Sequence, residues 1–217
     1  MFTLSITLII IIITVLISVT AFSNEKIMNE LIFYPPAVTG SKQYYRFITC
    51  GLIHADFFHL VFNMYALYLF GSSVEGWFVV IFGVKGKLLY LLMYISALVA
   101  SLLPTFSKHR HDSSYRSLGA SGAVSAVIFA NIMVEPLLGI GLVFIPGIFI
   151  PGFLFGLIYL GISSYLDKRG GGNINHSAHI WGALYGIAFF IVAAYVFSDF
   201  PLLAEFIRKI QDYVAKF

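Results

Sequence analysis

The amino-acid sequence predicts an all-α membrane protein built as one bundle of six transmembrane helices. Hydrophobic residues make up 59% of its 217 residues and charged residues 11%, whereas soluble domains are roughly half apolar and a quarter charged. The mean hydropathy is +0.92. Six apolar stretches approach the roughly 20 residues that a helix needs to cross a bilayer. We therefore expect a single membrane domain over residues 1–217, with the lipid bilayer as its surroundings.

The predicted spans can be placed in order along the chain. They fall at about 3–22, 54–72, 86–106, 121–137, 139–165 and 178–198. No basic residue precedes the first span, so we interpret it as a retained helix rather than a secretory signal peptide. An even number of spans places both termini on one side of the membrane.

Two segments outside the spans have a distinctive composition. The connection from Ser23 to Ile53 contains Tyr34-Pro35-Pro36, and prolines with aromatic residues favour a segment folded in or on the membrane interface. The tail at 204–217 places apolar and charged residues at helical spacing, which is typical of an interfacial amphipathic helix.

Charge and cysteine content exclude several classes of protein. The 13 basic and 10 acidic residues give a formal charge of +3 and are spread thinly through the loops. No basic run is dense enough to follow a phosphate backbone, so nucleic acid is not an expected partner. The single cysteine, Cys50, excludes an intrachain disulfide framework. The sequence indicates no particular oligomeric state.

Polar residues at the starts of the spans are the candidates for chemistry. Ser121 lies in the tetrapeptide Gly119–Gly122 where the fourth span begins, and His179 opens the sixth. Ionisable groups at the mouth of a membrane span are costly and mark functional sites. His59 and Asn63 are four residues apart, hence on one face of the second span. The alternation of spans places all four residues at the same side of the membrane.

These groups match the needs of acyl transfer. That reaction requires a nucleophile, a base that takes its proton, and donors aimed at the developing oxyanion. Ser121, His179 and the pair His59 and Asn63 supply one of each. Alternatives remain for each residue alone: a serine that bonds to its own helix backbone, a packing histidine, and an asparagine that joins two helices.

Small residues indicate how the two helices could approach each other. His179, Gly182 and Gly186 share one face of the sixth span. Small-xxx-small patterns of this kind permit close backbone contact, whereas bulky side chains hold helices about 8–10 Å apart. The fourth span offers a matching surface of Gly122, Ser125, Ala126 and Ala130. Simple helix packing is the alternative explanation.

Three acidic residues lie near the same side of the membrane. Asp56, Asp112 and Asp167 each follow or precede a span, but no motif connects one of them with His179. We therefore predict a Ser-His dyad rather than a triad.

At these residues the chain resembles the rhomboid family of intramembrane serine proteases, over roughly residues 44 to 190. Four motifs carry the resemblance: Tyr45-Arg46, where the family commonly has Trp-Arg; His54 with His59 and Asn63; the GxSG motif at Gly119–Gly122; and the AHxxGxxxG motif that starts at Ala178 and includes His179, Gly182 and Gly186.

The resemblance implies both an activity and a set of roles. Ser121 would be the nucleophile and His179 the general base and then acid, while the Ser121 backbone N–H and the side chains of His59 and Asn63 would form the oxyanion hole. No metal or cofactor is implied. Supporting roles would fall to Arg46, His54, Gly119, Gly122, Gly182 and Gly186. The substrates would be transmembrane proteins whose helix unwinds before cleavage.

The chain also departs from the family pattern. Many relatives carry, four residues after the nucleophile, an aromatic ring that stacks on the catalytic histidine, and this chain has Ser125 there. We therefore expect His179 to be positioned differently.

The orientation of the bundle is predicted differently by charge and by resemblance. Family resemblance implies a cytoplasmic amino terminus and an active site that opens to the extracytoplasmic side, and we expect a bacterial inner membrane. The positive-inside rule favours the reverse orientation. Five basic residues (Lys85, Lys87, Arg208, Lys209, Lys216) lie on the side of the termini and eight (Lys26, Lys42, Arg46, Lys108, Arg110, Arg116, Lys168, Arg169) on the other.

Two further functions stay open on the sequence. One is a non-proteolytic rhomboid-like factor for membrane-protein binding or quality control; such relatives typically lack the serine or the histidine. The other is a metal site or transporter, because His176 and His179 have a ligand-like spacing and His109 lies near His111.

Overall fold

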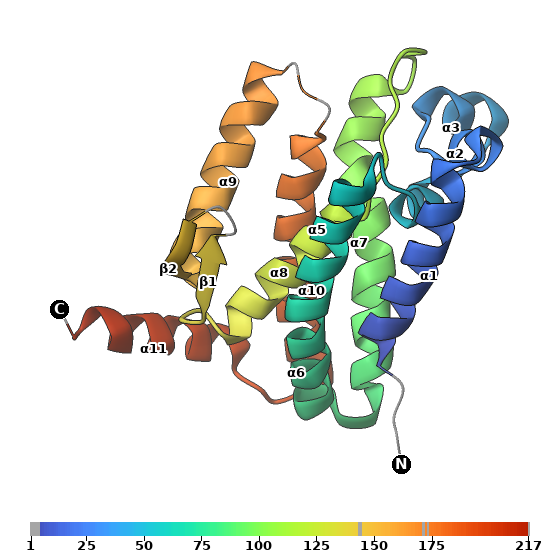
Figure 1. The fold of residues 1–217 in the computed structure, drawn as a ribbon. Coiled ribbons are helices and arrows are strands. Elements are labelled where there is room, and N and C mark those ends of the chain that lie inside the picture. Colours follow the sequence, from blue (N-terminus) through green and yellow to red (C-terminus); the bar gives the residue numbers. More distant parts are fainter. Residues whose placement is uncertain (1–4, 143–144, 171, 173, 217) are drawn as a thin grey trace.

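The computed structural model describes residues 5–142, 145–170, 172 and 174–216. Its long helices lie side by side, with short helices clustered at the end where α5 and α10 begin and α11 at the opposite end (Figure 1). The elements are α1 (Ile6–Phe22), α2 (Glu25–Leu31), α3 (Pro35–Ser41), α4 (Arg46–Thr49), η1 (Cys50–Leu52), α5 (Phe57–Ala66), η2 (Leu67–Gly71), α6 (Ser72–Phe82), η3 (Gly83–Lys85), α7 (Gly86–His109), α8 (Ser121–Val134), β1 (Gly139–Leu142), β2 (Ile145–Pro151), α9 (Gly152–Arg169), α10 (His176–Phe197) and α11 (Leu202–Val214).

The protein is mostly helical, as predicted, and its outer surface suits a bilayer. Large apolar side chains such as Leu16, Leu157 and Val192 are exposed on the long helices. By length and hydropathy, two helical stretches could cross a membrane, Phe57–His109 and His176–Phe197, and α1 and α8 are shorter apolar helices. The count of six spans therefore remains a prediction.

Helices α1 and α6 are joined through a buried carboxylate. Predicted span 3–22 becomes α1, with residues 3 and 4 outside the described part of the chain. Glu75 of α6 accepts hydrogen bonds from the backbone N–H groups of Ile6 and Thr7, at 2.8 and 2.9 Å. These are N–H groups that a helix start leaves without an intrahelical partner. The carboxylate thereby fixes the start of α1 against α6.

The second predicted span, 54–72, ends too early. Helix α5 starts at Phe57 and continues through the π-helical turn η2 into α6, which ends at Phe82. Polar residues, among them Ser72, Ser73 and Glu75, follow Gly71. They stay helical because Glu75 has partners on α1 and because Gly71 allows close packing, where an added Cβ would lie 2.7 Å from the Tyr90 hydroxyl. The third prediction, 86–106, corresponds to α7.

The fifth predicted span, 139–165, is wrong in its first half. Strands β1 (139–142) and β2 (145–151) pair antiparallel, with Gly139 opposite Pro151 and Ile140 opposite Ile150, and the helix α9 begins only at Gly152. Glycine and proline disfavour a helix here, and Gly147 has a φ of 86°. The fourth predicted span, 121–137, ends at Val134 because the residue before Pro136 is kept out of the helical region.

The last two predictions agree closely with the helices. Span 178–198 corresponds to α10 and the tail 204–217 to α11, whose helix ends at Val214. Lys209 of α11 donates a hydrogen bond of 2.7 Å from Nζ to the carbonyl of Val134 and lies 5.7 Å from the ring centre of Trp77. A cation at a helix C-terminus satisfies its last carbonyls. Helix α11 thus contacts the end of α8.

Candidate active site

Ser121 and His179 meet at the starts of two packed helices. Ser121 is the first residue of α8 and His179 lies in the first turn of α10. The distance between His179 Nε2 and Ser121 Oγ is 2.8 Å, which is hydrogen-bond length. The structure therefore brings together the two residues that the sequence predicted as nucleophile and base, although they are 58 positions apart.

Glycines allow this approach. A Cβ added at Gly182 would lie 2.0 Å from the carbonyl oxygen of Gly122, and one at Gly186 would lie 2.2 Å from that of Ala126. No side chain fits at these distances, so the backbones of α8 and α10 are in direct contact. Gly122 in turn packs on α7, where an added Cβ would lie 2.4 Å from Ser101 Oγ. The small residues predicted on the two helices do face each other.

The turn before Ser121 is fixed by backbone bonds to the segment near the amino terminus. Gly119 has a φ of 107°, a conformation that L side chains rarely adopt. Its N–H donates to the carbonyl of Cys50 at 2.9 Å, and Phe33 and Ser117 exchange two backbone hydrogen bonds. The segment between the first two long helices therefore supports the turn that presents the serine.

His54 connects this turn with α1. Its ring is fully buried. The Ser18 hydroxyl donates to the carbonyl of Leu52 at 2.9 Å and lies 3.0 Å from His54 Nδ1. Since the hydroxyl has one proton, Nδ1–H is the donor to Ser18 and Nε2 is free to accept the N–H of Ala120 at 3.5 Å. His54 thus supports the backbone next to Ser121 and does not contact the dyad.

One predicted oxyanion donor, His59, lies against this turn, and the other, Asn63, lies one helical turn further along α5. The ring of His59 covers Gly119, where an added Cβ would lie 2.7 Å from His59 Cε1. Asn63 is buried and donates from Nδ2 to the carbonyl of His59 at 2.9 Å, which leaves its second amide hydrogen for another acceptor. The N–H of Ser121 belongs to the first turn of α8, whose N–H groups have no intrahelical partner. In this structure neither side chain has a hydrogen bond to Ser121 among those described.

A ring stacks on His179, but it comes from a helix that the sequence did not indicate. Tyr159 of α9 lies with its ring centre 6.1 Å from that of His179 at an interplanar angle of 26°. Its hydroxyl is 2.7 Å from the Oγ of Ser125, the residue that replaces the usual ring. The signal in the sequence was the serine at position 125, where many relatives have a ring. The sequence does not show which of the 13 tyrosines supplies a ring instead.

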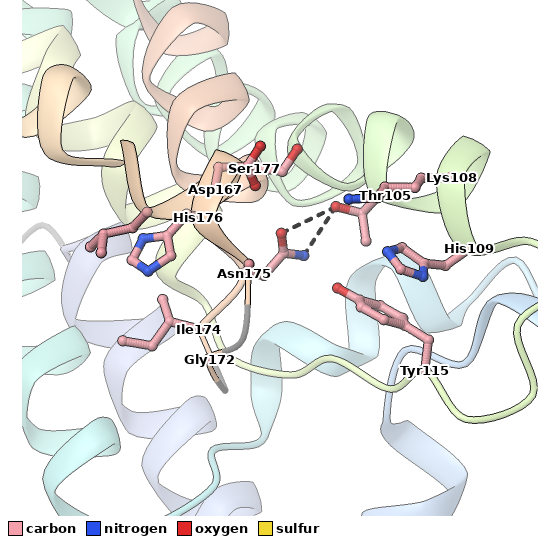
Figure 2. A pocket seen from close by; sticks show the side chains of 12 residues that line it. Thr105, Lys108, His109, Tyr115, Asp167, Gly172, Ile174, Asn175, His176 and Ser177 are labelled. Atoms are coloured by element: carbon pink, nitrogen blue, oxygen red, sulfur yellow. Dashed lines mark hydrogen bonds between the residues drawn. The ribbon is translucent and has the colours of Figure 1, made fainter. Parts of the chain in front are cut away.

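Asn175 fixes the start of α10 at the edge of a polar pocket. Its side-chain oxygen accepts the N–H of Ala178 at 3.0 Å, and its amide nitrogen donates to Thr105 of α7 at 3.1 Å. Figure 2 shows Asn175 pointing toward Thr105, with His109 and Tyr115 to one side and His176 to the other. This N-cap ties the helix that carries His179 to α7.

Arg46 is a structural residue in this arrangement. Its guanidinium is buried and donates to the carbonyls of Asn29 and Ile32 at 2.9 and 2.8 Å, and to the side chain of Gln43. Five donors in a fixed fork suit this use. Arg46 therefore holds the short helices together rather than contacting the dyad.

The three aspartates have partners other than His179. Asp56 caps α5 by accepting the N–H of His59 at 2.8 Å, and Asp167 lines the polar pocket. Hydrogen bonds from Ser114 and His109 lower the pKa of Asp112 to about 2. In the described part of the chain, no aspartate has a hydrogen bond to His179.

The histidines that suggested a metal site have other neighbours. His109 contacts Asp112 at 3.0 Å and stacks on Tyr115 with ring centres 3.9 Å apart. His176 lies edge-on to His179 at 5.8 Å. Among the described residues, no three His, Cys, Asp or Glu side chains are grouped so that they could hold a metal ion.

Comparisons with known proteins give the chain its relatives. "RHOMBOID-like protein 12, mitochondrial" of Arabidopsis thaliana is 32% identical over 66% of this chain and 44% of its own length. "Rhomboid-like protein 15" of the same plant is 30% identical over 74% and 39%. "Presenilin-associated rhomboid-like protein A, mitochondrial" of Danio rerio is 33% identical over 62% and 33%. The chain therefore matches less than half the length of these relatives.

The comparisons also bear on the predicted compartment and on the family. A relative from Bacillus subtilis is 29% identical over 44% of this chain, beside the mitochondrial proteins named above. Together they do not support the bacterial inner membrane as the particular location, although they agree with a membrane protein. The sequence profile described as "Rhomboid domain" matches residues 41–196, which include Ser121, His179, His59 and Asn63. The chain is therefore a member of the rhomboid family.

Proposed function

We propose that this chain is a serine-type endopeptidase that hydrolyses peptide bonds in or near the transmembrane segments of other membrane proteins. The observation that carries the proposal is the 2.8 Å contact between His179 Nε2 and Ser121 Oγ. A nucleophile and a base within hydrogen-bond reach are the signature of an activated serine. The proposal is also supported by the rhomboid family, which includes serine proteases.

In the first half-reaction, Ser121 Oγ attacks the carbonyl carbon of the scissile bond while its proton passes to His179 Nε2. The new C–O bond turns the carbonyl oxygen into an oxyanion. The Ser121 N–H, the His59 ring and the free amide hydrogen of Asn63 are the donors proposed for that oxyanion. His179 then gives its proton to the leaving amine as the C–N bond breaks, which leaves an acyl-enzyme on Ser121.

In the second half-reaction, water replaces the amine. His179 takes a proton from a water molecule, the hydroxide attacks the acyl carbon, and the proton returns to Ser121 Oγ as the C–O bond breaks. Asn175 and His176 line a polar pocket (Figure 2), and we propose that water reaches the dyad from the side of this pocket.

The proposed substrates follow from the backbone hydrogen bonding of a transmembrane helix. A transmembrane helix has all its backbone groups paired, so its peptide bonds are not available to a serine until the helix unwinds. We therefore propose transmembrane proteins with helix-weakening residues near the membrane surface and a small side chain before the cut. One membrane domain with six spans remains the proposed arrangement, and no metal or cofactor takes part in these steps.

The side of the membrane on which the dyad opens is part of the proposal. We follow the family resemblance and place it on the extracytoplasmic side, against the basic residues that favour the opposite orientation. Labelling of an introduced cysteine, Lys108→Cys with Cys50→Ser, by a membrane-impermeant thiol reagent in intact cells tests the orientation.

The decisive experiment is cleavage by the purified chain reconstituted into lipid vesicles with a single-span substrate. We expect Ser121→Ala and His179→Ala to abolish cleavage, because each removes one member of a unit whose loss typically costs several orders of magnitude in rate. A fluorophosphonate should label Ser121 in the wild-type chain and not in Ser121→Ala. Retained cleavage by Ser121→Ala would refute the proposal.

The same labelling distinguishes the non-proteolytic alternative. A rhomboid-like binding or quality-control factor would retain membrane-protein substrates in a pull-down without cleaving them, and its Ser121 would not react with the fluorophosphonate. The dyad contact favours the protease, because a pure binding protein has no need of a histidine 2.8 Å from a serine.

A further inference from the structure

We propose that Tyr159 of α9 is a positioning residue for His179, held in place by Ser125. The inference rests on the proposed function, since it concerns the orientation of the base. It assigns to α9 a part of the catalytic geometry that the sequence motifs place elsewhere.

The ring of Tyr159 is well placed for this role. It lies nearly parallel to the imidazole of His179, at 26° and 6.1 Å between ring centres, within the range of offset aromatic stacking. Phe129 of α8 and Phe155 of α9 lie 5.6 and 5.9 Å from it. The Tyr159 ring therefore limits the rotation of the imidazole on one face, while its own position is limited by two further rings.

Hydrogen bonds connect the same ring with the catalytic helix. Ser125 Oγ lies 2.8 Å from the carbonyl oxygen of Ser121 and 2.7 Å from the Tyr159 hydroxyl. Because Ser125 has one hydroxyl proton and donates it to that carbonyl, Tyr159 is the donor to Ser125. Two consecutive hydrogen bonds thus connect Tyr159 through Ser125 with the backbone of Ser121, which is the residue that His179 must face.

Close packing of α9 brings the tyrosine into reach. At Gly156, three residues before Tyr159, an added Cβ would lie 3.3 Å from the ring of Phe129 and 3.4 Å from Ile132. Only Gly152, Gly156 and Ser163 are buried among the α9 residues. Helix α9 therefore packs on the bundle through a narrow face, and Tyr159 lies beside that face with its ring toward His179.

A base must keep its accepting nitrogen directed at the nucleophile, since small misplacements of a catalytic group lower the rate steeply. Loss of the ring should therefore lower kcat and the rate of fluorophosphonate labelling, and leave KM nearly unchanged. We expect about a 10-fold reduction for Tyr159→Ser, and about a 3-fold reduction for Tyr159→Phe, which keeps the ring and loses the bond to Ser125.

The test compares five forms of the reconstituted chain, which are the wild type, Tyr159→Ser, Tyr159→Phe, Tyr165→Ser and a double exchange, by labelling rate, kcat, KM and thermal unfolding. Tyr159→Ser removes the ring. Tyr165→Ser removes an exposed tyrosine from the same helix and is the matched control, expected to resemble wild type. The exchange Ser125→Tyr with Tyr159→Ser returns a ring of equal size to the space beside His179 from the α8 side, and should recover most of the lost labelling.

Each outcome decides the inference. It is overturned if Tyr159→Ser labels at the wild-type rate, if its loss matches that of Tyr165→Ser, or if the exchange recovers nothing while the fold stays intact. If the wild-type chain itself is neither labelled at Ser121 nor active, the proposed function fails and the positioning role falls with it. A labelled wild type with an unaffected Tyr159→Ser refutes the positioning role alone.

Discussion

Helices α9 and α10 approach α8 in different ways. Helix α10 meets it through backbone contacts at Gly182 and Gly186, where an added Cβ would fall 2.0 and 2.2 Å from a carbonyl oxygen. Helix α9 meets it through side chains, with an added Cβ at Gly156 no closer than 3.3 Å. The distance between Ser121 and His179 is therefore set by main chain, whereas in our proposal the orientation of the His179 ring depends on a side chain from the less buried helix α9.

This difference predicts unequal sensitivity to the same substitution. Gly182→Ala should have the largest effect, because its methyl group must displace the Gly122 backbone and hence separate the dyad. We expect fluorophosphonate labelling to be lost and the free energy of unfolding to fall by about 1–3 kcal/mol or more, measured by denaturant titration in micelles. Gly161→Ala, where an added Cβ meets nothing within 4 Å, is the control; equal effects at both positions would contradict the backbone-contact explanation.

Gly156→Ala should have a smaller effect. The neighbouring Phe129 ring and Ile132 side chain can move by a few tenths of an ångström, so we expect less than about 1 kcal/mol of destabilisation. Labelling should fall about 2-fold, because a displaced α9 shifts Tyr159 from His179. If Gly156→Ala proved as damaging as Gly182→Ala, the two interfaces would be equally rigid and the comparison would fail.

The smallest effect should come from Asp112, in the loop that precedes the catalytic turn and outside both interfaces. Its folded pKa of about 2 lies below the usual value near 4. The depressed pKa contributes stability that is present above about pH 4 and is lost as the pH falls through 2. Asp112→Asn should therefore lower the unfolding temperature slightly at neutral pH and reduce its dependence on pH between about 4 and 2. An unchanged acid dependence would show that Asp112 does not contribute.

Sequence patterns located the parts of the site that local geometry determines. Ser121 and His179 stand in short motifs that contain glycines. The helical spacing of these glycines is enough to predict that the two helices pack closely. The alternation of spans also placed the starts of α5 and α10 at one end of the bundle, as Figure 1 shows. These inferences depend on residues near each other in sequence or on topology alone.

Three errors have a different origin, since each depends on a partner elsewhere in the fold, whereas the end of α8 at Val134 follows from the local rule at Pro136. Residues 139–151 are apolar enough for a helix, but 139–142 and 145–151 pair as two strands, which accommodate their glycines and prolines. Helix α6 continues past Gly71 because Glu75 has partners at the start of α1. Tyr159 could not be chosen among the tyrosines before α9 was placed. Packing at long range decides such features.

The bond from Lys209 to the carbonyl of Val134 has a practical consequence for work on this protein. Helix α11 looks dispensable, because it lies outside the bundle and follows the last catalytic motif. Its removal would leave the final carbonyls of α8 without their cation, 13 residues from Ser121 along one helix. A shortened protein that ends at α10 is thus a poor reference for activity, and a purification tag belongs after α11 rather than in its place.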